Sequence, residues 1–241
     1  MIGLGLVDVK DISVRGLETV KFCDFVYLEN YTSILQNSVA DPEKLYGKKI
    51  ILADRELVEK NADEILDKAR DNEVAFLVVG DPMCATTHID LWIRAKEKGI
   101  RVEVIHNSSI ISAIGEIGLE VYKYGKVTSI PFHNKDVKTP VEVYNLNYKI
   151  GLHTLFLLDL EPKSSKFLSI REAAAYLINN GVDSKIVAIG AARIGAKDSV
   201  IHVGKLSEIG AFNYGNAPYA LVIPGRMHFM EEEALELWKE K

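Results

Sequence analysis

A glycine-containing loop with one carboxylate is the segment of this sequence best suited to chemistry. Gly80-Asp81-Pro82 follows residues 74–79, an unbroken apolar run typical of a fully buried parallel strand. The glycine permits a sharp turn, the proline stiffens the chain, and Thr86 or Thr87 can cap a following helix. Asp81 would then present a carboxylate at the end of a strand. The same residues also fit a structural Asx turn, but their position favours a ligand-binding loop.

Two other loops have a similar composition. Gly3-Leu4-Gly5 follows the first apolar run, where glycine lets a ligand approach the backbone, although a plain turn explains it equally well. A third glycine at the spacing of a dinucleotide fingerprint is missing, which argues against a nicotinamide site. Asn107-Ser108-Ser109 follows residues 102–105, and its hydroxyls and free N–H groups suit either a polar ligand or simple helix capping.

Several other chemistries have little support in the sequence. The six histidines form no close pair at metal-ligand spacing, so we expect no metal site. Cys84 lies near Asp81 but has no Cys-His signature around it, and a small buried apolar role suits it better than a nucleophile. The chain has no nucleophile-elbow motif and no phosphate-loop motif.

Alternating elements must position these loops in the first half. Apolar runs predict strands at 1–6, 25–28, 50–52, 74–79 and 102–105, and apolar spacing predicts helices at 13–23, 55–69, 87–98 and from about 108. This alternation predicts parallel strand–helix–strand units. Ligands bind such sheets beyond the carboxyl ends of the strands, so we expect the loops at 3–8, 80–87 and 106–110 to meet there.

The second half changes character and predicts a second domain. Strands are expected at 126–132, 154–158, 185–191 and 219–223, and helices from Pro140, at 170–180 and at 230–238. Tyr124-Gly125 interrupts the pattern, so we place the domains at 1–123 and 124–241. No linker rich in Pro, Gly or Ser separates them.

Composition excludes several classes of protein. The 241 residues are 48% hydrophobic and 26% charged, which is ordinary for a globular chain. The net charge of −5 argues against a large nucleic-acid footprint. No run approaches the ~20 apolar residues of a membrane helix, and no basic segment of a signal peptide begins the chain. We therefore expect a cytoplasmic protein.

A set of short motifs resembles the diphthine synthases, which belong to the tetrapyrrole-methylase-like superfamily of methyltransferases. Gly-Asp-Pro is shared with the wider superfamily, whereas Tyr-Thr-Ser, Ala-Thr-Thr-His and Gly-Leu-His-Thr-Leu are more particular to diphthine synthases. The matching stretches run from one end of the chain almost to the other: Ile2-Gly3-Leu4-Gly5-Leu6, Tyr31-Thr32-Ser33, Gly80-Asp81-Pro82, Ala85-Thr86-Thr87-His88, Gly151-Leu152-His153-Thr154-Leu155 and Ile223-Pro224-Gly225.

The resemblance implies a fold, a reaction and a partner. The implied fold is a two-lobed α/β structure with a mainly parallel N-terminal sheet, a mixed C-terminal sheet and S-adenosylmethionine in the cleft between them. The implied reaction trimethylates the amino group of 2-(3-amino-3-carboxypropyl)histidine on translation elongation factor 2, releases S-adenosylhomocysteine and forms diphthine. Eukaryotic relatives add a further methyl to the carboxylate, and the compact length here suits the archaeal type. A homodimer is also implied.

The family's cofactor contacts map by position onto residues of both halves. They are Leu6, Asp81, Cys84, Ser109, Ile110, Leu158, Ile194 and Tyr219. Cys84, Ile194 and Tyr219 differ in type from the residues of relatives, a change that matters little where the contact is made through the backbone. His88 and Tyr31 are candidates for holding the acceptor, and a structural role fits each of them nearly as well.

The chemistry of methyl transfer shapes what we expect of these residues. The attacking amine must be neutral, and for a pKa of roughly 8 to 10 its deprotonation at pH 7 costs about 1.4 to 4 kcal/mol. Orientation of two reactants is worth about 7 to 11 kcal/mol. Positioning should therefore outweigh base catalysis, and no indispensable catalytic residue is expected. Asp81 is our candidate for steering the methyl donor through its amino group or sulfonium charge.

Two alternatives remain open at the level of sequence. One is a methyltransferase of the same superfamily that acts on a corrinoid or another tetrapyrrole, against which the more particular motifs count. The other is a cofactor-binding regulator without catalytic activity.

Overall fold

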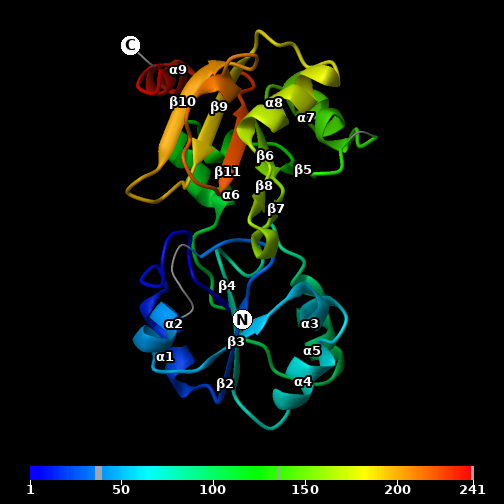
Figure 1. Ribbon diagram of the computed structural model, residues 1–241, viewed down its shortest axis with the longest axis vertical. Coiled ribbons are helices and arrows are strands. Elements are labelled where there is room, and N and C mark those ends of the chain that lie inside the picture. The colour runs from blue at the N-terminus through cyan, green and yellow to red at the C-terminus, as the bar shows by residue number, and fades with distance from the viewer. Residues whose placement is uncertain (36–39, 135, 240–241) are drawn as a thin grey trace. The chain divides into compact units, whose positions relative to one another are not determined.

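The computed structural model describes residues 1–35, 40–134 and 136–239 (Figure 1). The chain divides into two compact units, Met1–Ile111 and Ser112–Lys241. The boundary that the sequence suggests, between residues 123 and 124, lies further along the chain and stays a prediction, as does the cofactor cleft.

A parallel sheet forms the centre of the first unit. Its strands lie in the order β1-β4-β2-β3, and all of their pairings are parallel. Their bounds are β1 (Ile2–Gly3), β2 (Phe25–Glu29), β3 (Ile50–Ala53) and β4 (Val74–Val78). This confirms the parallel strand–helix–strand units that the alternating pattern predicts. Residues 102–105, expected as a strand, contribute only a single parallel bridge from Ile105 to Ile2.

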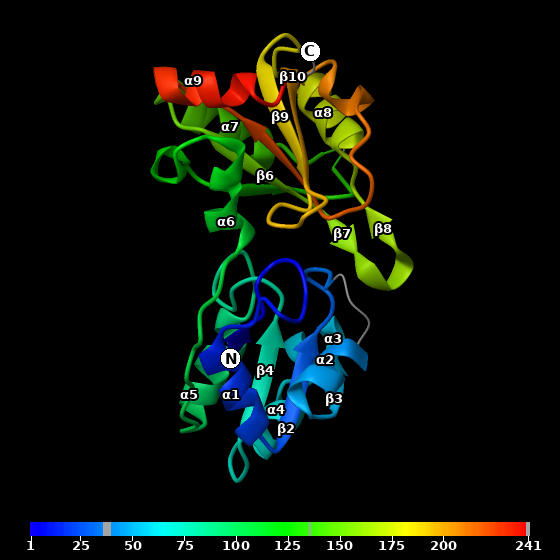
Figure 2. The same ribbon diagram turned by 90° about the vertical axis from the view of Figure 1, so that its left-hand side faces the viewer.

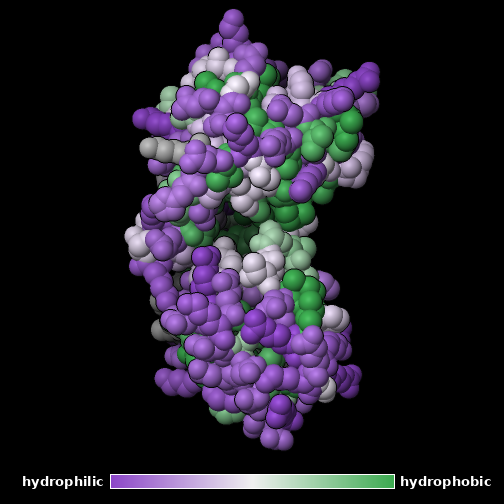
Figure 3. Space-filling view, turned by 90° about the vertical axis from the view of Figure 1, so that its right-hand side faces the viewer, coloured by the Kyte–Doolittle hydropathy of each residue, from purple (hydrophilic) through white to green (hydrophobic). Residues whose placement is uncertain are grey.

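Helices cover both faces of this sheet (Figure 1). Successive side chains of a strand point to opposite faces of the sheet. In β2, Val26 and Leu28 therefore pack with α1 and α2, whereas Tyr27 packs with α3, α4 and α5. The outer surface of α3, α4 and α5 is mainly hydrophilic (Figure 3). The helix bounds are α1 (Val14–Phe22), α2 (Ala40–Tyr46), α3 (Arg55–Glu59), α4 (Asp63–Lys68) and α5 (Ile89–Glu97).

The prediction of a single helix over residues 55–69 was wrong, because this segment forms two separate helices, α3 and α4. α3 ends at Glu59, and the N–H groups of Lys60 and Asn61 both donate to the carbonyl of Glu56, which closes the helix instead of extending it. Asn61 is a poor residue for a helix interior. The apolar spacing continues across the break, so periodicity alone does not reveal it.

The second unit contains a mixed five-stranded sheet in the order β10-β9-β11-β6-β5. Only β5 and β6 pair in parallel, and the remaining pairings are antiparallel, which confirms the expected mixed sheet. The bounds are β5 (Thr128–Ile130), β6 (Thr154–Leu158), β9 (Val187–Ala192), β10 (Val200–Lys205) and β11 (Tyr219–Ile223), with a separate hairpin of β7 (Leu160–Glu161) and β8 (Lys166–Phe167).

Two helices of the second unit share its main core. Apolar residues of α7 and α8, such as Tyr144 and Leu177, pack against Phe156 and Leu221 of the sheet, and α9 lies on the other side of the sheet (Figure 2). The helices are α6 (Ile110–Ala113), which spans the boundary between the units, α7 (Thr139–Lys149), α8 (Ile170–Asn179) and α9 (Phe229–Glu236), with short 3-10 turns η1 (Ile114–Ile117), η2 (Val121–Lys123), η3 (Pro162–Ser164) and η4 (Ile209–Ala211).

A buried carboxylate anchors the start of α9. Glu231 is 1% exposed, and its oxygens accept from the backbone of Glu120 at 2.9 Å, from the backbone of His228 at 2.7 Å, from Lys123 and from His153 Nε2 at 2.9 Å. The other ring nitrogen of His153 accepts from the N–H of Gly225 at 2.9 Å. The histidine of the Gly-Leu-His-Thr-Leu motif is therefore fully buried and neutral, and it ties β6 to α9.

Replacement of Glu231 should reveal the strength of this anchor. Burial alone would raise the pKa of Glu231, but the surrounding donors outweigh it and lower the pKa from 4.5 to about 2. We expect Glu231→Gln to lower the free energy of unfolding by about 3 kcal/mol at neutral pH, because a buried ionic network loses its charge. Since this stabilisation is present above pH 4.5 and is lost toward pH 2, the deficit should shrink over that range.

Denaturant unfolding at a series of pH values measures this difference. Glu232→Gln, which changes the exposed neighbour on the same helix, is the matched control and should stay within about 0.5 kcal/mol of the wild type. If Glu231→Gln lowers the free energy of unfolding equally at pH 3 and pH 7, the ionised Glu231 is not the source of this stabilisation.

Candidate active site

The carboxylate of Asp81 joins two loops at the carboxyl end of the first sheet. β4 ends just before it, and the Asp81 side chain is 4% exposed. One oxygen accepts from the N–H of Met83 at 2.9 Å. The other accepts from the N–H of Asn107 at 3.0 Å and lies 2.8 Å from Nδ1 of His106. The loop after β4 and the loop after residue 105 are thus held by one side chain.

These contacts decide the charge of Asp81. Burial alone would raise the pKa of its carboxyl, but the hydrogen bonds from Met83, Asn107 and His106 outweigh burial and hold the pKa below its ordinary value. Asp81 is therefore ionised at neutral pH. An ionised carboxylate can only accept hydrogen bonds, so Nδ1 of His106 carries a proton.

The first loop of the chain reaches the same place through its glycines. Gly5 and Gly80 exchange two backbone hydrogen bonds, of 3.2 and 2.6 Å, and both have positive φ angles. A Cβ atom at Gly3 would lie only 2.6 Å from the carbonyl oxygen of Gly80, so a side chain there would separate the two loops. The amide of Asn107 donates to the carbonyl of Gly3 at 3.0 Å. The prediction that these three loops meet is confirmed.

The predicted cofactor residues of the first unit gather around this junction. Leu6 follows the Gly5–Gly80 bridge, and the N–H of Cys84 donates to the carbonyl of Asp81 at 3.3 Å. Ser109 is buried, and Ile110 begins α6 directly after it. The structure thus brings Leu6, Asp81, Cys84, Ser109 and Ile110 together, while their contact with a cofactor stays a prediction.

The predicted cofactor residues of the second unit share one edge of its sheet. In the register of the strands, Tyr219 at the start of β11 lies opposite Ala192, the last residue of β9. On its other side, Ala220 lies opposite Leu157 of β6. Leu158 and Ile194 therefore flank Tyr219.

Arg193 fixes the loops at this edge and was missed by sequence reasoning. It is 8% exposed and has a positive φ of 52°, a conformation unfavourable for a residue with a side chain. Its guanidinium donates to the side chain and the carbonyl of Asp198, at 2.7 and 2.6 Å, to the carbonyl of Tyr214 at 2.8 Å and to that of Asn216. One buried cation therefore joins the loop after β9 to the loop before β11.

Glu116 of η1 holds the same loop from another element. Its carboxylate accepts from the N–H of Gly195 at 2.9 Å and from the hydroxyl of Ser199 at 3.2 Å. Ile194 is thus enclosed between two charged anchors and is 6% exposed. A charged residue inside the otherwise apolar run Ala191-Ala192-Arg193-Ile194 is the sequence signal that could have indicated the first anchor.

The two candidate acceptor residues are buried beside each other. His88 is fully buried, and its ring lies edge-on to Phe76 at 5.2 Å and to Tyr31 at 6.2 Å between centroids. Burial lowers the pKa of His88 to about 4, so the ring is neutral. Tyr31 is 7% exposed. This packing fits the structural role that the sequence left open for both residues.

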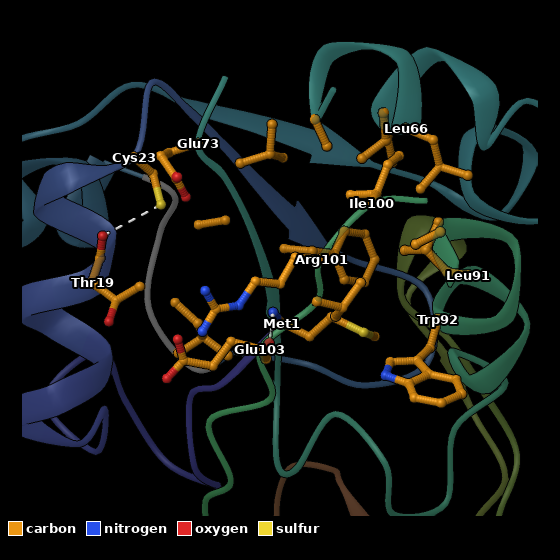
Figure 4. A pocket seen from close by; sticks show the side chains of 18 of the residues that line it. Met1, Thr19, Cys23, Leu66, Glu73, Leu91, Trp92, Ile100, Arg101 and Glu103 are labelled. Atoms are coloured by element: carbon orange, nitrogen blue, oxygen red, sulfur yellow. Dashed lines mark hydrogen bonds between the residues drawn. The ribbon is translucent and has the colours of Figure 1, made fainter. Parts of the chain in front are cut away.

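A separate pocket lies at the opposite end of the first sheet. It measures about 330 Å³ and is lined where the strands begin, by Met1, Val74 and Ile100 among others. Apolar side chains including Leu66 and Trp92 form one side (Figure 4). Its lining includes none of the predicted cofactor residues.

Residues 1–35, 40–134 and 136–239 contain no group of three His, Cys, Asp or Glu side chains placed to hold a metal ion. In the same part of the chain, no helix is both long enough and apolar enough to cross a membrane.

Comparison with known proteins defines the family. The model of the "Tetrapyrrole (Corrin/Porphyrin) Methylases" matches residues 1–210. The chain is 43% identical to the diphthine synthase of Methanosarcina mazei, over 97% of this chain and 93% of that protein. It is also 43% identical to the diphthine methyl ester synthase of Schizosaccharomyces pombe, over 99% and 93% of the two chains. A crystal structure of a diphthine synthase superposes with a TM-score of 0.93 at 37% identity, covering 99% of this chain and 94% of that one.

The chain therefore belongs to the tetrapyrrole methylases and, within them, to the diphthine synthase group. This agrees with the family that its motifs resemble. The fold that the resemblance implies, with a parallel first sheet and a mixed second one, is also confirmed.

Arg193 should be needed for order at the edge of the second sheet. We expect Arg193→Gln to lower the free energy of unfolding by about 3 kcal/mol, because it leaves buried carbonyl groups without donors. Hydrogen exchange of residues 194–199 and 214–218 should accelerate more than that of the β6 core. Arg171→Gln, which removes an exposed arginine with one bond to Gly210, is the control. Equal exchange rates in both variants would contradict the role of Arg193.

Proposed function

We propose that this protein is an S-adenosylmethionine-dependent methyltransferase that trimethylates the amino group of 2-(3-amino-3-carboxypropyl)histidine on translation elongation factor 2. The observation that carries the proposal is full-length similarity to diphthine synthases, at about 40% identity. The convergence of Asp81 with the loops at Gly3 and Asn107 supports it, because this edge is where parallel sheets bind ligands.

The backbone at the edge of the first sheet supports a site for S-adenosylmethionine. Gly3 and Gly80 bring backbone without side chains to the junction, and a Cβ at Gly80 would be in ordinary contact with Ser109 at 3.9 Å. We assign the polar end of the ligand to the edge of the first unit, near Asp81 and Ser109. Leu158, Ile194 and Tyr219 are the contacts that we propose for the second unit. When bound, this substrate supplies an electrophilic methyl group.

Removal of Asp81 tests the cofactor assignment. The negative charge of Asp81 favours the cationic methyl donor. The hydrogen bonds of Asp81 also hold the loop that would contact S-adenosylmethionine. We expect Asp81→Ala to weaken binding of S-adenosylmethionine about 10- to 100-fold, equivalent to about 1.4 to 2.8 kcal/mol. Titration calorimetry measures the dissociation constant, and circular dichroism checks the fold. Asp90→Ala, on the exposed surface of α5, is the control. Unchanged affinity in Asp81→Ala would remove this role.

Transfer of label to the elongation factor tests the reaction itself. The purified protein is incubated with methyl-labelled S-adenosylmethionine and elongation factor 2 that carries the unmethylated modification. We expect label on the factor and three methyl groups on the modified histidine by mass spectrometry. Label on a tetrapyrrole would favour the corrinoid alternative, and cofactor binding without transfer to either acceptor would favour a regulator.

A fourth methyl group is the specific alternative product. The identity to the Schizosaccharomyces pombe diphthine methyl ester synthase equals that to the archaeal diphthine synthase, so similarity alone does not separate the two products. A methyl ester is lost in mild alkali, whereas methyl groups on nitrogen are retained. Three alkali-stable methyl groups support diphthine, and a fourth, labile one supports the ester.

The proposal extends to a cytoplasmic homodimer. Exposed apolar side chains of the second unit lie on adjoining segments. The backbone N–H of His153 donates to the carbonyl of Lys123, and the backbone N–H of Arg226 donates to the carbonyl of Gly151. These apolar side chains include Tyr122, Ile150 and Phe229, at 80, 70 and 65% exposure. A second copy of the chain would cover such a surface. Light scattering that yields the mass of one chain at micromolar concentration would contradict the dimer.

A further inference from the structure

We propose that His106 is a catalytic residue, the proton acceptor for the amine that is methylated, and that Asp81 is its positioning residue. The proposal rests on the proposed function, because it places the base at the edge assigned to the methyl donor. It goes beyond the sequence analysis, which named no catalytic residue.

The geometry of the pair is that of a carboxylate orienting an imidazole. Nδ1 of His106 lies 2.8 Å from an oxygen of Asp81. The side chain of Asp81 is 4% exposed, whereas that of His106 is 69% exposed. The N–H groups of Met83 and Asn107 fix the carboxylate in turn. The ring is therefore anchored on one edge by a rigid, buried acceptor and open on the other.

This arrangement determines the tautomer of the neutral ring. Asp81 is ionised and can only accept, so the proton stays on Nδ1 and the lone pair of neutral His106 is on Nε2. Among the described residues, Nε2 has no hydrogen-bond partner. An oriented base with a free lone pair is the arrangement that general base catalysis requires.

Within the described residues, Asp81 is the charged side chain that pairs with the ring of His106. On the neighbouring loops, the Asp11 carboxylate accepts from the N–H of Val7 at 2.8 Å, and the Cys84 thiol lies on the Asp81 side of the junction. The charged partner of the His106 ring is therefore the Asp81 carboxylate.

The step is balanced without any further reagent. The acceptor ammonium gives one proton to Nε2 of His106. The freed lone pair bonds to the methyl carbon as the carbon–sulfur bond breaks, and that electron pair stays on sulfur. The imidazolium then returns its proton to solvent. Each of the three transfers needs one such deprotonation, because the nitrogen becomes a cation again every time.

The pH dependence of methyl transfer by His106→Gln tests the role. Glutamine can still hydrogen-bond to Asp81 but takes no proton. We expect kcat to fall about 100-fold near neutral pH. The deficit should narrow toward the pH range of roughly 8 to 10, where the acceptor amine loses its proton unaided. A merely structural role would keep the deficit constant with pH. The affinity for S-adenosylmethionine should stay within about twofold.

A control variant and an NMR measurement of the ring nitrogens test the role of His106 separately from effects on folding and on activity. His133→Gln, at an exposed histidine of the second unit, should match the wild type at every pH. Long-range ¹H–¹⁵N NMR of the ligand-free wild type should show neutral His106 protonated on Nδ1. A proton on Nε2, or a deficit that does not vary with pH, overturns the proposal.

The two proposals fail in different ways. If the wild type transfers no label, the proposed function and the role of His106 both fall. If the wild type transfers label and His106→Gln matches it at every pH, only the role of His106 falls.

Discussion

The hydrogen bonds of one buried carboxylate hold the carboxyl edge of the first sheet in its conformation. Asp81 is ionised and almost inaccessible to solvent, a state that costs several kcal/mol unless the charge is compensated. The N–H groups of Met83 and Asn107 and the ring of His106 provide that compensation. Since these donors come from two segments of the chain, the charge is stable only when both loops are in place.

The second unit uses the same principle with the opposite charge. Arg193 is buried at the end of β9, and its donors are taken up by Asp198, Tyr214 and Asn216. In both units the sheet interior is apolar, and these two buried charges, Asp81 and Arg193, lie where a strand gives way to a loop. Loops lack the backbone pairing of a sheet, so charged side chains that satisfy several carbonyl or N–H groups at once supply the missing order.

The sequence predicts the framework of the fold better than the contacts that fix its loops. The apolar run at residues 74–79 identifies a buried strand because burial on both faces excludes polar residues, and it also locates Asp81 at the strand end. By contrast, β10 was not expected, since polar His202 and Lys205 interrupt its apolar residues. The break between α3 and α4 depends on local backbone bonding that apolar spacing does not encode.

The contacts of the site are long-range, which is why sequence patterns did not reveal them. His106 meets Asp81 across 25 positions, and Glu116 meets Gly195 across 79. Neither pair has a local spacing rule comparable to a helix cap. The sequence therefore identified the loops that carry the candidate site, but not the charged residues that hold those loops.

The packing of the loops accounts for the side chains at two of the predicted contact positions. The hydroxyl of Tyr219 donates to the carbonyl of Gly215 at 2.6 Å, so the side chain is engaged with its own loop. Ile194 is buried between the anchors of Arg193 and Glu116. At both positions the packing of the loop decides which side chain fits.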